Sequence, residues 1–140
     1  MTSAPAAIPS EGAGNNLGGT PKWKGLATQS WDTDKYGLQL SERWISKGVY
    51  SNEFIECQTN CPVSTVNSPT INYNKMSGAL YLDIGARYYI TDRLTAFVKV
   101  DNLLDRDPTP SPQTNTGIDI NPALYDTIGR MYRAGIRYNF

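Results

Sequence analysis

The chain has 140 residues, enough for one ordinary domain. Its 13 Lys and Arg residues balance its 13 Asp and Glu residues, so the charge gives no case for nucleic acid, whose binding proteins usually carry a basic patch. The chain has no His, which excludes the common Ser-His-Asp and Cys-His nucleophile arrangements within it, and we expect neither an enzyme nor a cofactor.

The first twenty residues are predicted to be a loop. Residues 1–20 are rich in Gly, Ala, Ser and Asn, and they lack the basic segment and the apolar core of a secretory signal peptide. The glycines between Glu11 and Gly19 lack the spacing of a dinucleotide-binding fingerprint. We expect residues 1–20 to be a disordered loop remnant and residues 21–140 to be the folded unit.

Two weak strand patterns come next in the chain. In Lys22–Asp32, Trp23 and Trp31 fall on one face with only small or polar residues between them. In Lys35–Ser46 the alternate residues are apolar, except that Glu42 interrupts them. Alternation with a period of two predicts strands, and helical periodicity is nearly absent from the chain.

Three clear strand patterns follow, at Ala79–Ile90, Leu94–Asp105 and Met131–Phe140. In each, one face is apolar or aromatic and the other carries charges or Gly. The apolar faces comprise Leu80, Leu82, Ile84, Ala86, Tyr88 and Ile90 in the first, Leu94, Ala96, Val98 and Val100 in the second, and Tyr132, Ala134, Ile136, Tyr138 and Phe140 in the third. We therefore expect an all-β fold of about five antiparallel, up-and-down strands.

The predicted connections alternate in length. Short turns lie near Asp32–Asp34 and Thr91–Arg93, whereas Gly48–Ser77 and the Pro-rich segment Asp105–Thr127 are long. In an up-and-down sheet both long loops fall at one end, as in outer-membrane barrels with long extracellular loops and short periplasmic turns.

Alternation alone also fits a soluble β-sandwich, whose apolar face points inward. Two features favour a large transmembrane β-barrel instead. Long charged side chains alternate with Gly and Tyr on the polar faces, as in a wet lumen, and aromatic residues lie near strand ends, as in the girdles of membrane barrels. These aromatic residues are Trp23, Trp31, Tyr36, Trp44, Tyr88, Tyr138 and Phe140.

The end of the chain holds an ordered set of motifs. Asn102-Leu103-Leu104-Asp105 follows one strand pattern, Gly129-Arg130 precedes the last, and Phe140 closes the chain. This set resembles the C-terminal end of a TonB-dependent outer-membrane receptor, which commonly has an Asn-Leu-aromatic-Asp pattern there, with Leu104 where Phe is usual. Thr20–Gly25 also resembles a pattern of that family, so the resemblance covers about residues 20–140.

The resemblance implies a protein of the cell outer membrane that takes up a siderophore, cobalamin or similar cargo with energy from the TonB complex. Residues 21–140 would be the C-terminal segment of its barrel. Its partners would be outer-membrane lipid, the barrel-assembly machinery, and the plug and other strands of the receptor. About five strands cannot close a barrel, so we expect a fragment that is inactive and not stably inserted when alone.

Several residue roles follow from the resemblance. Tyr132, Ile136, Tyr138 and Phe140 would form the assembly signal, because an unpaired strand edge can add to another sheet. The loops Val49–Met76 and Arg106–Thr127 would contact cargo. Arg87, Lys99, Arg133 and Arg137 would face the lumen as an ordinary ladder of charges.

The only two cysteines of the chain, Cys57 and Cys61, lie in the first long loop. The exported location implied by the resemblance is oxidising, which favours a local disulfide over two free thiols. A metal site is disfavoured because His is absent, and we interpret Asp105 and Asp107 as parts of a solvated loop rather than cation ligands.

The alternatives to the receptor are a non-transporting small surface or outer-membrane β-module, a gene remnant, and a soluble β-sandwich binding module.

Overall fold

The computed structural model describes residues 12–110 and 120–140. Residues 1–11 of the expected N-terminal loop and residues 111–119 of the second long loop lie outside the described residues. The described part of the chain contains no helix long and apolar enough to span a membrane.

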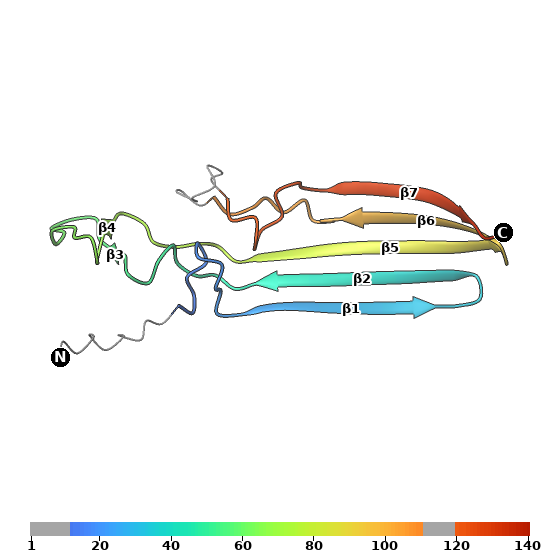
Figure 1. Ribbon diagram of the computed structural model, residues 1–140, viewed down its shortest axis with the longest axis horizontal. Helices are drawn as coiled ribbons and strands as arrows, with labels where there is room; N and C mark the ends of the chain where they lie inside the picture. The colour runs from blue at the N-terminus through green and yellow to red at the C-terminus, as the bar shows by residue number, and fades with distance from the viewer. Residues whose placement is uncertain (1–11, 111–119) are drawn as a thin grey trace, which may run out of the picture.

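The main element is an antiparallel sheet of five strands in the order β1-β2-β5-β6-β7 (Figure 1). The strands are β1 (Lys24–Asp32), β2 (Tyr36–Ile45), β5 (Ala79–Thr91), β6 (Leu94–Asp101) and β7 (Met131–Tyr138). Each strand pairs with the next large strand along the chain, which is an up-and-down topology. The all-β prediction with about five such strands is confirmed.

The first long connection contains two further strands that the sequence does not predict. β3 (Ile55–Glu56) and β4 (Thr70–Ile71) form a small parallel pair. Each has two residues, too few for alternation to be visible.

The two ends of the large sheet differ (Figure 1). The short turns between β1 and β2 and between β5 and β6 lie at the end where the chain terminates, which we call the turn end. The long connections lie at the opposite end, which we call the loop end. The unequal loop lengths predicted from the sequence therefore correspond to the two ends of one sheet.

Cross-strand pairing joins the separate apolar patterns into one face. One row runs from Gln29 through Leu40, Ile84 and Val100 to Tyr132. Paired residues in a sheet point to the same side, so the register places the apolar positions of all five strands together. We call this surface the apolar face and its reverse the polar face.

No second layer covers the apolar face among the described residues. Val98 is 46% exposed and Ile136 is 72% exposed, although both lie mid-strand. A soluble β-sandwich would pack a second sheet against such residues. The sheet is instead a single layer, with β1 and β7 at its edges.

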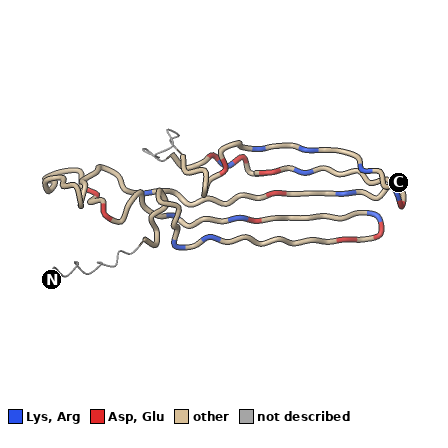
Figure 2. Tube along the Cα trace, in the orientation of Figure 1, with Lys and Arg blue, Asp and Glu red and all other residues tan. Residues whose placement is uncertain are grey.

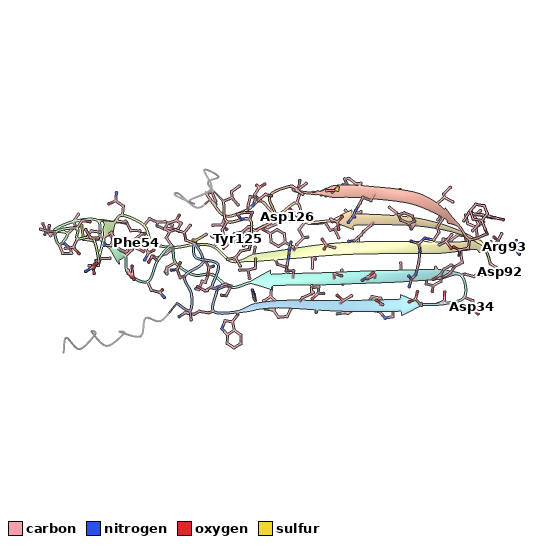
Figure 3. All side chains as sticks on the ribbon, in the orientation of Figure 1. Asp34, Phe54, Asp92, Arg93, Tyr125 and Asp126 are labelled. Atoms are coloured by element: carbon pink, nitrogen blue, oxygen red, sulfur yellow. A yellow bond between two sulfur atoms is a disulfide. The ribbon has the colours of Figure 1, made fainter. Side chains whose placement is uncertain are left out.

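The buried core lies at the loop end of the sheet rather than along the middle of its strands. Tyr125 and Asp126 lie there, as Figure 3 shows. The buried apolar residues form one cluster, which comprises Ile45, Met76, Ala79, Tyr81, Leu124 and Tyr125. The long connections therefore fold over the strand ends and share one core with them.

Candidate functional site

The polar face carries ion pairs within one strand and between different strands. Asp32 on β1, Gly37 on β2 and Arg87 on β5 form one row. Arg87 Nε donates to Asp32 Oδ1 at 3.1 Å across the intervening strand. A Cβ at Gly37 would lie 2.4 Å from that Nε, so the glycine provides the space in which the guanidinium lies.

A second ionic group joins β6 and β7 on the same face. Lys99 Nζ lies 2.8 Å from Asp101 Oδ1, and Arg133 pairs with Asp101 Oδ2. Arg137 is in no ion pair within the described part of the chain. Three of the four basic residues expected on this face therefore lie in cross-strand or same-strand ion pairs.

Cations outnumber carboxylates on the polar face. Figure 2 shows basic and acidic positions along the strands. The strand register assigns to this face Lys24, Arg43, Arg87, Lys99, Arg133 and Arg137, with Asp32, Asp83 and Asp101. Glu42 is the one acidic strand residue on the opposite, apolar face, paired with Leu82.

The motif residues at the end of β6 form a compact turn. Asn102 has a positive φ of 49°, which ends the strand, and its side chain bonds both the N–H and the C=O of Arg106. The Asn102 N–H donates to Asp83 Oδ1 at 2.8 Å. Leu103 and Leu104 stay 38% and 53% exposed. The strand pattern continued to Asp105 in the sequence, but the conformation of Asn102 stops it at Asp101.

The two motifs Asn102–Asp105 and Gly129–Arg130 meet in this turn. Asp105 Oδ1 accepts the backbone N–H of Arg130 at 3.1 Å, and Asp105 Oδ2 lies 3.3 Å from Arg130 Nη2. Gly129 has a φ of 83°, which favours glycine. The hydrogen bond from Arg130 to the Tyr132 hydroxyl raises the pKa of Arg130 above its ordinary value, and Asp105 adds to this. The motifs thus connect the end of β6 to the start of β7.

We expect Asp105→Ala to destabilise the folded chain by about 1–2 kcal/mol. Asp105 has a φ of 51°, a conformation that costs Ala about 1–2 kcal/mol and that Asp and Asn tolerate. Asp105→Asn keeps an oxygen acceptor for the Arg130 N–H and is the matched control. Urea titration in detergent measures the free energy of unfolding, and equal values for the two variants would contradict this role of Asp105.

The residues of the expected assembly signal lie along β7, except Phe140, which lies just beyond the strand at the turn end. Tyr132, Ile136 and Tyr138 are on the apolar face and are 67%, 72% and 52% exposed. The strand ends at Tyr138, so Phe140 lies past it, with its ring 5.2 Å from that of Tyr138 in an edge-on contact. Recognition by an assembly machinery stays a prediction.

The first long connection is held by a disulfide and by one amide. Cys57 and Cys61 are joined in a disulfide. Asn74 is buried, and its Oδ1 accepts the N–H groups of Tyr50 and Ser51 while its Nδ2 donates to the Ser51 carbonyl. Burial, and next the charge of Tyr73, raise the pKa of the Tyr50 hydroxyl. This loop is therefore folded rather than extended.

Replacing both Cys57 and Cys61 by Ser is expected to loosen this loop by about 2 kcal/mol, because a closed ring of this size restricts the unfolded chain. Proteolytic cleavage between Ile55 and Ile71 should become faster. Gln58→Ala, an exposed change within the same ring, is the control, and cleavage no faster than in this variant would contradict the expectation.

Buried polar contacts connect residues far apart in sequence at the loop end. Asn16 Nδ2 donates to the Ser46 carbonyl at 2.9 Å, and Asn121 Nδ2 donates to the Leu17 carbonyl at 2.8 Å. The Tyr125 hydroxyl donates to the Ser77 carbonyl at 2.9 Å. These bonds join the N-terminal segment and both long connections into one base.

A recess of about 770 Å³ opens beside this base. Lys22, Lys47 and Lys75 line it together with Tyr73, and none of its lining residues in the described part of the chain is acidic. Lys75 also pairs with Glu56 at 3.3 Å. No sequence pattern predicts this site, because its lysines come from three separate segments of the chain. The first predicted cargo loop lines the recess in part, since Val49, Asn52, Tyr73, Lys75 and Met76 belong to it.

Comparison with known proteins yields one structural likeness. No protein-family model matches the chain, and no curated protein matches it significantly. The chain is similar to a crystal structure of a mutant ferric enterobactin receptor from Pseudomonas aeruginosa, with a TM-score of 0.51 and 22% sequence identity. The match covers 82% of this chain and 16% of that chain. The likeness shows a related fold, that of an open antiparallel sheet similar to part of a β-barrel receptor.

Proposed function

We propose that this chain is a wall section of a TonB-dependent outer-membrane receptor, with its loop end outside the cell and its turn end in the periplasm. The observation that carries the proposal is the continuous, uncovered apolar face, which lies opposite an ion-paired polar face. Membrane barrels alternate in this way between lipid and lumen. The motifs at Asn102–Asp105 and Gly129–Arg130, and the likeness to a ferric enterobactin receptor, support it.

In this role the chain acts with other parts of a receptor. The remaining strands would close the barrel, the plug would fill it, and the TonB complex would supply energy for uptake. The barrel-assembly machinery would bind the exposed edge of β7, which carries Tyr132, Ile136 and Tyr138.

Spin labels on adjacent residues test which face meets lipid. Val98→Cys and Lys99→Cys place a nitroxide on the apolar and the polar face of β6 in detergent micelles, which can cover the apolar face of an open sheet. The disulfide leaves no native free thiol to compete. We expect oxygen to relax the label at position 98 more strongly and a water-soluble nickel complex to relax the label at position 99 more strongly. Equal responses at the two positions would overturn the proposal.

The lysine-lined recess is the part of the loop end best suited to bind cargo. Its three lysines, of which Lys75 is paired with Glu56, and the absence of carboxylates among its described lining residues favour a negatively charged ligand. An anionic ferric siderophore fits this chemistry better than a neutral cargo, because Coulomb attraction acts only on the charged ligand. We infer that the uptake substrate is of this class.

Replacing Lys22 and Lys47 by Gln should weaken binding of ferric enterobactin at least about tenfold, since each charge lost near an anion removes about 1 kcal/mol in water. A titration followed by intrinsic tryptophan fluorescence measures the affinity, and the difference should shrink at high salt. The control is Lys35→Gln, which removes one lysine charge from the turn between β1 and β2, away from the recess. Equal affinities for the double variant and this control would exclude the recess as the binding site.

A further inference from the structure

A carboxylate interrupts the apolar face near the loop end. Glu42 on β2 is paired with Ala27 on β1 and with Leu82 on β5, so both of its cross-strand neighbours are apolar. Its side chain is half-buried and is in no hydrogen bond or ion pair within the described part of the chain. All six basic residues of the five large strands are on the polar face, so these strands supply no counter-charge to Glu42.

Exposed tryptophan rings follow this carboxylate on the same face. Trp44 is the next residue of β2 on the apolar face and lies one residue before the loop end of the strand (Figure 1). Its ring occupies the space that a Cβ at Gly25 would take, and Trp44 stays 43% exposed. Trp23, whose carbonyl accepts the Ser46 N–H, comes next and is 73% exposed. A carboxylate beside an aromatic ring is the combination that binds an ammonium ion, through an ion pair and a cation–π contact.

A second polar group lies on the other side of the carboxylate, further from the loop end. Gln29 on β1 is paired with Leu40, in the row that follows the row of Ala27 and Glu42. Successive rows on one face are two residues apart, which is about 7 Å along an antiparallel strand. The Gln29 side chain makes no hydrogen bond within the part of the chain that the structure describes. From the loop end inward, the apolar face therefore presents aromatic rings, then a carboxylate, then a carboxamide.

We propose that Glu42, Trp44 and Gln29 form a binding site for a lipid whose headgroup ends in an ammonium group. The ammonium pairs with Glu42 against the ring of Trp44, the Gln29 amide donates to an ester carbonyl, and the acyl chains lie along the apolar residues beyond. A bilayer has the same order, because its headgroups lie at the level of the aromatic girdle and its hydrocarbon lies further in. The proposal rests on the lipid-facing role proposed above and adds to it the class of headgroup. A second copy of the chain would bring no strand cation to this face.

Competition between two phospholipids tests the proposal. The full chain in detergent micelles is mixed with equal amounts of phosphatidylethanolamine, which carries an ammonium group, and phosphatidylglycerol, which does not. Native mass spectrometry measures how much of each lipid stays bound. We expect at least about fivefold more phosphatidylethanolamine than phosphatidylglycerol, the ratio that an ion pair of about 1 kcal/mol gives. Glu42→Gln should reduce this ratio to about one, whereas Gln29→Leu should reduce the bound amount of both lipids and keep the ratio, because both lipids carry ester groups.

A charge-matched control separates the position of the carboxylate from the net charge of the chain. Glu42→Gln combined with Gln39→Glu moves the carboxylate to the polar face of the same strand, and the preference should be lost as in Glu42→Gln alone. Equal binding of the two lipids by the unaltered chain, or a preference that persists in either Glu42 variant, would overturn the proposal. The spin-label test does not depend on the headgroup, so a correctly facing sheet without a lipid preference would refute this inference alone.

Discussion

Val98→Arg should reduce partitioning of the chain into detergent micelles or lipid vesicles by about thirty-fold or more. Arg or Lys on the lipid face near the midplane of a barrel costs about 2–4 kcal/mol, and about 1.4 kcal/mol corresponds to a factor of ten. Val98 lies mid-strand between Ala86 and Ala134, and neither neighbour offers a carboxylate to pair with the new charge.

Gln39→Arg introduces the same side chain on the polar face of β2 and is the matched control. Co-sedimentation with vesicles measures the bound fraction of each variant. Binding by Gln39→Arg should stay near that of the unaltered chain. If both substitutions reduced binding equally, the reduction would come from charge alone, and the two faces would not differ in their solvent.

The second large effect is expected at the loop end, where the second long connection contacts Tyr81 of β5. Tyr81 is 1% exposed, its ring packs under Arg43 at 4.8 Å, and its hydroxyl accepts the Asp126 N–H at 3.1 Å. Truncation of a buried aromatic residue to Ala costs about 3–5 kcal/mol. We expect Tyr81→Ala to detach the second long connection from the sheet, and hydrogen exchange at Tyr125 and Asp126 to become much faster.

Tyr81→Phe separates the ring from the hydroxyl. It keeps the packing and leaves the Asp126 N–H without its acceptor, which costs about 1–3 kcal/mol. Exchange should therefore accelerate less than in Tyr81→Ala and most strongly at Asp126. Unchanged protection in Tyr81→Ala would show that the loop base is held by other contacts.

The large sheet could be predicted from the sequence because its two faces differ in polarity along every strand. The alternation in Ala79–Ile90 is visible without a structure, since every second residue has the same environment. Even the weak pattern of Lys22–Asp32 corresponds to a strand. In that strand Gly25 is matched to Trp44, whose ring lies 2.1 Å from the position a Cβ would take. Where the apolar pattern of a strand is interrupted by Gly, the large side chain of the paired residue on the neighbouring strand can thus occupy the space.

The loop end could not be predicted in the same way. Its core brings together Ile45, Met76 and Leu124, which are far apart in the chain, and the recess combines Lys22, Lys47 and Lys75. Such contacts depend on how two long connections fold over the strand ends, and no local sequence periodicity indicates them. The motif residues at Asn102 and Gly129 were recognisable, but their mutual contact through Asp105 and Arg130 required coordinates.

The balanced charge of the whole chain conceals an uneven distribution in space. Six cations and three carboxylates lie on the polar face, while Glu42 points the other way and other acidic residues lie in turns and loops. If this face lines a water-filled lumen, as proposed, the excess would produce a positive electrostatic potential, with a reach of about 8 Å at physiological ionic strength. An anion that leaves the proposed binding recess would then move along a surface that continues to attract it, and raising the salt concentration would slow its passage.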